Sequence, residues 1–87
     1  MAIAGVVIKA TPEKEQEVAN QLTAWQGIEI HQITKGNIVA VLEGPDLQWL
    51  NWISTQITNI PDVLVVLPAY INQEDLQSRE ENQGSAV

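Results

Sequence analysis

Hydrophobic and polar positions follow two alternating patterns along the first part of the chain. Residues 3–10 are nearly all apolar and rich in Val and Ile, which predicts a buried strand. Residues 11–27 carry apolar side chains at helical spacing, with Thr11 as the predicted N-cap and Gly27 as the helix end. Residues 28–34 return to a strand-like composition. The first unit therefore runs strand, helix, strand.

The second half of the chain repeats this order. A glycine-containing turn at 35–37 leads into an apolar strand at 38–42. Asp46 is the predicted N-cap of a second helix that runs to about Thr58, and residues 63–71 form the last predicted strand. The complete predicted order is βαββαβ.

One constant offset relates the two units. Moving the sequence by 35 positions pairs Ile3 with Ile38 and Val18 with Ile53. Two units are too few for a solenoid, so they favour a closed fold with internal pseudo-symmetry, although a chance match of hydrophobic patterns is the alternative. The element order predicts an α+β, ferredoxin-like fold, in which a four-stranded antiparallel sheet carries two helices on one face.

The length of 87 residues allows one domain, which we place at residues 1–72. Residues 73–87 are polar and acid-rich, with few apolar side chains to offset the entropy of ordering. They are predicted to form a disordered acidic tail.

The predicted sheet is apolar on both faces. Strand side chains alternate, and Lys9 is expected outside the core, which places Ala4 and Val6 under the helices. The repeat carries the same assignment to Val39 and Val41. The uncovered face is then predicted to contain Ile3, Gly5, Val7, Ile38, Ala40, Leu42, Leu64 and Val66, with Glu29, His31 and Ile33 at its rim.

Such an apolar face typically marks a binding surface. The candidate peptide-binding residues are Ile3, Val7, Glu29, His31, Ile38, Ala40, Leu42, Leu64 and Val66. A second copy of the chain is an alternative occupant, which makes a homodimer possible. If the facing of a strand is assigned one residue out of register, every side chain of that strand moves to the opposite face of the sheet.

Composition excludes several classes of function. A net charge of −7 repels the phosphates of nucleic acid, and the absence of Cys excludes disulfide scaffolds and thiolate metal sites. Without disulfides a secreted scaffold is not expected, which makes the cytoplasm the expected compartment. The apolar runs are too short to span a membrane. His31 lacks partners at ligand spacing, and no motif joins an acid, a base and a nucleophile. We expect no metal, no cofactor and no enzymatic activity.

The chain also combines features known from one protein family: a Thr-capped acidic helix, an aromatic residue two positions before a glycine, and several apolar positions. The residues concerned are Val6, Val7, Gln21, Leu22, Trp25, Gly27, Glu29, Gly36, Ile38, Val39, Ala40, Val41, Glu43, Asp46, Val63, Leu64, Val66 and Tyr70. Over about residues 3–72, this combination resembles the NapD family. This resemblance implies a cytoplasmic chaperone that binds the twin-arginine signal peptide of the periplasmic nitrate reductase catalytic subunit. Binding would hold back export until the molybdenum cofactor is loaded.

The residues themselves are consistent with that implication. A twin-arginine signal has a basic front and an apolar middle, and it suits an apolar platform flanked by acids such as Glu29 and Glu43. The alternative is an ACT-type regulatory domain, which shares the element order and binds small molecules. Such domains resemble one another in a glycine-rich first loop, whereas this chain has Thr11, Pro12 and Glu13 there.

Overall fold

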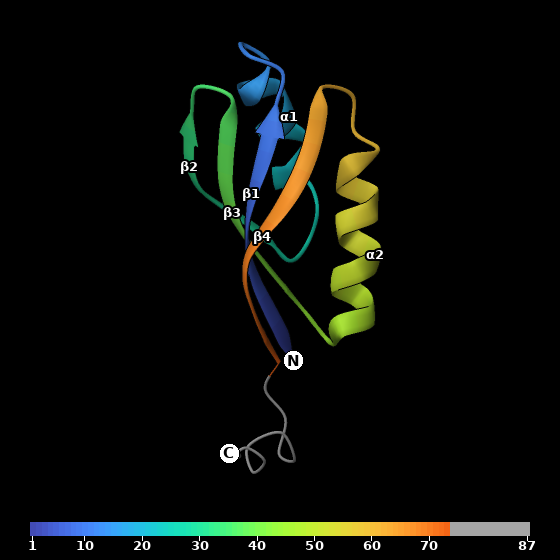
Figure 1. Cartoon of the computed structure of the whole chain (residues 1–87). Coiled ribbons are helices and arrows are strands. Elements are labelled where there is room, and N and C mark those ends of the chain that lie inside the picture. Colours follow the sequence, from blue (N-terminus) through green and yellow to red (C-terminus); the bar gives the residue numbers. More distant parts are fainter. Residues whose placement is uncertain (74–87) are drawn as a thin grey trace.

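The computed structural model describes residues 1–73 and confirms the predicted fold. Four strands form one antiparallel sheet in the order β2-β3-β1-β4, and both helices lie on the same side of it (Figure 1). The elements are β1 (Ala2–Ala10), α1 (Glu15–Thr23), β2 (Ile28–Thr34), β3 (Asn37–Gly44), α2 (Leu47–Thr58) and β4 (Val63–Gln73). Apart from Gln73, which ends β4, the predicted acidic tail lies outside the described residues.

The core lies between the sheet and the helices. Val18 and Leu22 of α1 and Ile57 of α2 are almost fully buried against Val6 and Ile8 of β1. Burial of each such aliphatic side chain contributes about 1.5–3 kcal/mol. The apolar stripes predicted on both helices are therefore what fixes them to the sheet.

The helix ends differ from the prediction in α1 and agree with it in α2. Thr11 does not cap α1: it begins a turn closed by the Lys14 N–H donating to the Thr11 carbonyl at 2.9 Å, and Glu13 has a φ of 74°. Pro12 suits the second position of such a turn, so the helix starts only at Glu15. The cap predicted at Asp46 is confirmed, because its carboxylate accepts the Trp49 N–H at 2.9 Å.

The end of α1 also comes earlier in the chain than the pattern predicts. The helix stops at Thr23, and Gly27 lies in the following loop with a φ of 91°. Trp25 is consequently a loop residue, although its ring still packs against the core.

The facing of β3 is opposite to the prediction. Ala4, Val6 and Ile8 lie under the helices as expected, and they pair across the sheet with Leu42, Ala40 and Ile38. Directly paired residues share a face, so these three β3 side chains belong to the core. The 35-residue offset fits the helices, where Val18 and Ile53 are both buried, but it is one residue out between β1 and β3. A shift of one residue exchanges the faces of a strand.

Candidate binding surface

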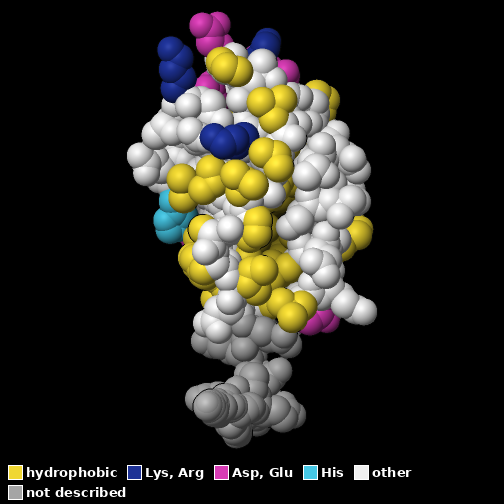
Figure 2. Space-filling view, in the orientation of Figure 1, with side chains coloured by type: hydrophobic (Ala, Val, Ile, Leu, Met, Phe, Trp, Pro, Cys, Tyr) yellow, Lys and Arg dark blue, Asp and Glu magenta, His cyan; other side chains and the backbone are white. Residues whose placement is uncertain are grey.

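The sheet has one face that no helix covers, and we call it the open face. It faces the viewer in Figure 1, and Figure 2 shows hydrophobic side chains along the middle of this face in the same orientation. The strand register assigns these apolar or small residues to it: Ile3, Gly5, Val7, Val39, Val41, Val65, Leu67 and Tyr70. Side chains on the central strands are half-buried, whereas those on the edge strand β4 are exposed.

The structure places five of the nine predicted contact residues at the surface of the sheet. Ile3 and Val7 lie on the open face, and Glu29 and His31 are exposed on the edge strand β2. Leu64 is 65% exposed in a β4 bulge between the residues paired with Lys9 and Ala10.

Four predicted contact residues are wrongly placed. Ile38, Ala40 and Leu42 are 0% exposed in the core, so they cannot touch a ligand on the open face. Val66 pairs with Ile8 and packs against the core on the helix side. The β3 part of the surface is instead made by Val39 and Val41, which the 35-residue repeat places in the core. The apolar run 38–42 contains no polar residue that would contradict the repeat.

Tyr70 was also missing from the predicted surface. It pairs with Gly5, and a Cβ atom at Gly5 would overlap the Tyr70 ring. The aromatic ring therefore lies over the bare backbone of β1, with 52% of the residue still exposed. Tyr70 joins apolar surface to a phenolic oxygen, a combination typical of binding surfaces.

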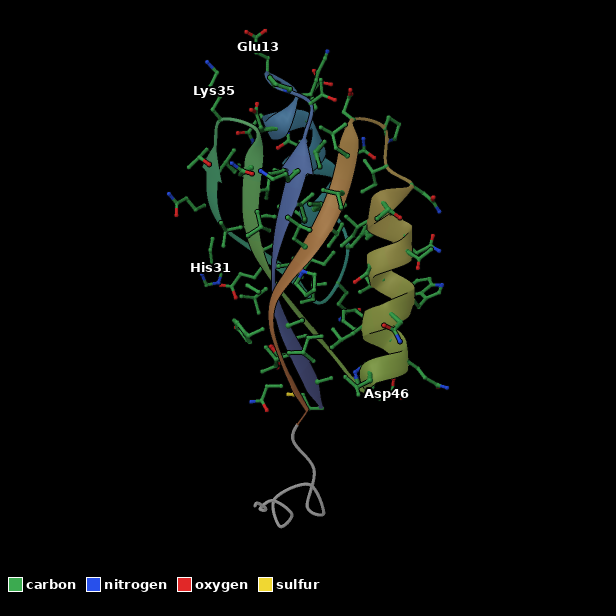
Figure 3. All side chains as sticks on the ribbon, viewed as in Figure 1. Glu13, His31, Lys35 and Asp46 are labelled. Carbon is green, nitrogen blue, oxygen red and sulfur yellow. The ribbon has the colours of Figure 1, made fainter. Side chains whose placement is uncertain are left out.

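Two carboxylates flank one end of the open face. Glu29 pairs with Val41, and Glu43 pairs with Ile3, so both acids belong to the uncovered side of the sheet. The Nε2 atom of His31 lies 3.6 Å from Oε1 of Glu29, and Figure 3 shows this His at the β2 edge.

A hollow of about 680 Å³ opens between these acids. Its lining residues are Met1, Gly27, Ile28, Glu29, Val41, Glu43, Gly44 and Pro45. It joins an apolar floor to two exposed carboxylates, which is the chemistry that an arginine side chain requires: apolar contact for the stem and paired oxygens for the guanidinium group.

Within residues 1–73, no group of three or more His, Cys, Asp or Glu side chains is placed to hold a metal ion. None of the helices in the same region is long and apolar enough to cross a membrane.

The fold and the open face define a small ferredoxin-like binding protein. A family model described as NapD protein matches residues 1–75, and the chain belongs to the NapD family. Its structure is similar to one described as the solution structure of the E. coli Tat proofreading chaperone protein NapD, with a TM-score of 0.74 and 23% identity. The match covers 98% of this chain and 86% of that one. No curated protein gives a significant match.

Family membership confirms the resemblance inferred from the sequence. It also confirms the predicted class of function, a non-catalytic chaperone of the NapD type, over an enzyme or an ACT-type regulatory domain.

Proposed function

We propose that the open face is where this NapD-family chaperone binds the twin-arginine signal peptide of the periplasmic nitrate reductase catalytic subunit. Binding takes place in the cytoplasm and keeps the subunit from export until it is mature. The observation that carries the proposal is the continuity between the apolar open face and the hollow between Glu29 and Glu43.

The apolar middle of the signal peptide fits the centre of the open face. Val7, Val39 and Leu67 lie side by side across β1, β3 and β4, with Ile3 and Val41 nearer the acids. Burial of one Leu or Phe of the peptide against such a platform contributes about 1.5–3 kcal/mol. An exposed Arg–Glu pair contributes about 0–1 kcal/mol. The apolar middle therefore supplies most of the affinity.

The arginines supply register and orientation. Glu29 and Glu43 both lie at the end of the open face where β3 finishes, close to Gly44. If the arginines of the peptide enter this hollow, the apolar middle extends from it along the strands toward Val7 and Leu67. A carboxylate can bind a guanidinium group through two parallel hydrogen bonds, which a lysine cannot match.

A charge on the open face tests the proposal. Replacing Val39 with Glu puts a carboxylate at the centre of the apolar platform, beside Val7 and away from the acids, where binding of an apolar segment would desolvate it. We expect Val39→Glu to weaken binding of the synthetic signal peptide by about tenfold or more, measured by calorimetry. Gln21→Glu adds the same charge at an exposed position on α1 and serves as the matched control.

The possible outcomes of this experiment are distinct. Equal affinities of Val39→Glu and Gln21→Glu for the peptide, with both variants folded, would contradict the open-face site. A second copy of the chain is the competing occupant of this face. Sedimentation of the free protein tests it, because a dimer that Val39→Glu converts into a monomer assigns the face to self-association.

A further inference from the structure

A second hollow lies on the helix side of the molecule, and we call it the tryptophan groove. It has a volume of about 340 Å³ and is lined by Trp25, Gln26, Trp49, Trp52, Ile53 and Gln56. These are the three tryptophans of the chain, and no lining residue is charged. Trp52 is 56% exposed, so the groove offers an aromatic surface to solvent.

A third hollow borders both the tryptophan groove and the open-face hollow, and we call it the middle hollow. It has a volume of about 300 Å³ and is lined by Gln26, Gly27, Glu43, Gly44, Pro45 and Trp49. It shares Gly27, Glu43, Gly44 and Pro45 with the open-face hollow, and Gln26 and Trp49 with the tryptophan groove. The three hollows therefore follow one another from the open face around the end of the sheet to α2.

Two glycines allow the Trp49 ring to lie close to the backbone beside these hollows. A Cβ atom at Gly44 would overlap the indole ring of Trp49, and one at Gly27 would lie 3.1 Å from the same ring. The Trp49 ring therefore lies directly against the backbone. Trp49 lines both the middle hollow and the tryptophan groove.

The charges beside these hollows suit a cationic segment. Glu29 and Glu43 line the open-face hollow, and Glu43 also lines the middle hollow. Asp46 follows Pro45 of the middle hollow in the sequence, and its carboxylate accepts the backbone N–H of Trp49 as the N-cap of α2. Figure 3 shows Asp46 at the opposite end of the molecule from Lys35. The other described lysines, Lys9 and Lys14, also lie toward that far end, where Lys9 pairs with Asn37 and Lys14 precedes α1.

We infer that the first part of the basic front of the signal peptide, the residues before its twin arginines, passes Glu43 and binds in the tryptophan groove. This inference rests on the proposed function, because it continues the same peptide from the open face. The front leaves the open face at the acid-flanked hollow, and a Lys or Arg side chain of it stacks on the indole rings by cation–π attraction. The groove then recognises a part of the partner that the sheet does not reach.

Tryptophan fluorescence tests this directly, because the open face itself contains no tryptophan. We compare two synthetic signal peptides without tryptophan, one complete and one lacking the residues before the arginines. We expect the complete peptide to change the emission and to protect it from acrylamide quenching. The shortened peptide should still bind, but it should not protect the exposed Trp52 from the quencher. The contribution of Trp52 is the difference between the unmodified protein and Trp52→Ala, because Trp49 lies against Gly44 and can also respond to the arginines.

A variant in the groove completes the experiment. Trp52→Ala removes an exposed ring and should weaken the complete peptide by roughly two- to fivefold, the size of an exposed cation–π contact. It should leave the affinity of the shortened peptide unchanged. Asn51→Ala, an exposed neighbour on α2 outside the groove, is the matched control.

Two contrary results separate the two proposals. Binding of the complete peptide with unchanged emission and an unaffected Trp52→Ala variant overturns the tryptophan groove and leaves the open face standing. Failure of both peptides to bind the unmodified protein overturns the proposed function, and the groove assignment with it.

Discussion

At the scale of single residues, Glu15 joins two parts of the fold that are distant in sequence. Its side-chain Oε2 accepts the backbone N–H of Gly36 in the β2–β3 turn, and the residue is only 9% exposed. This hydrogen bond lowers the pKa of Glu15 below its ordinary value of 4.5, with a further contribution from its own backbone N–H. Since α1 has no side-chain N-cap, Glu15 provides the polar anchor of its first turn.

Replacement of Glu15 with Gln should therefore destabilise the protein in a pH-dependent way. The lowered pKa means that the fold favours the carboxylate, so this stabilisation is complete above pH 4.5 and disappears as the pH falls through the pKa of the folded state. We expect thermal melts of the wild type and Glu15→Gln to differ most near neutral pH and to converge in acid. Glu17→Gln is the control, because Glu17 is exposed and makes only a 3.6 Å ion pair with Lys14. A constant difference at all pH values would show that the charge of Glu15 is not involved.

At the scale of elements, the sequence predicts which segments are strands and helices better than it predicts how they meet. The strands, both apolar helix stripes and the Asp46 cap follow from local patterns, and the structure contains them. The start of α1 is different, because Pro12 fits a helix N-terminus and a turn equally well. The anchor at Glu15 depends on a contact with the distant Gly36, which no local pattern reveals.

The residues of the open face also differ in how far the sequence alone predicts their placement. On β1, Lys9 is exposed and reveals the facing, so Ile3 and Val7 were assigned to the correct face. On β3, the run 38–42 is apolar throughout, and only its register with β1 decides which residues are buried. The exposure of Glu29 and Glu43 can be predicted without the register, because charged side chains are expected outside the core.

The facing of β3 leads to a prediction about folding. Ala40 is 0% exposed beneath the helices, whereas its neighbour Val39 lies on the open face. Ala40→Glu should abolish cooperative thermal unfolding, because it buries an unpaired carboxylate at a cost of several kcal/mol. Val39→Glu should keep a cooperative transition, as monitored by circular dichroism. Loss of the cooperative transition in Val39→Glu but not in Ala40→Glu would instead support the facing predicted from the repeat.

At the scale of the whole molecule, negative charge and apolar surface serve different steps of binding. The chain has a net charge of −7, and the acids Glu29, Glu43 and Asp46 lie toward one end of the described fold. A basic peptide front is attracted to that end before any apolar contact forms. The open face then retains the peptide, because apolar contacts do not depend on screening by salt.

Ionic strength should consequently act mainly on the rate of association. Between low and physiological salt, the Debye length falls from about 30 Å to about 8 Å, which screens the acids from an approaching peptide. We expect the association rate to fall by about tenfold and the dissociation rate to change little, measured by stopped-flow fluorescence or surface plasmon resonance. Glu43→Gln should reduce the association rate at low salt and lessen its salt dependence, whereas Glu17→Gln, an equal charge change on α1, should have a smaller effect. A salt effect confined to the dissociation rate would instead indicate that the arginines are held in tight, desolvated pairs with the carboxylates of the open-face hollow.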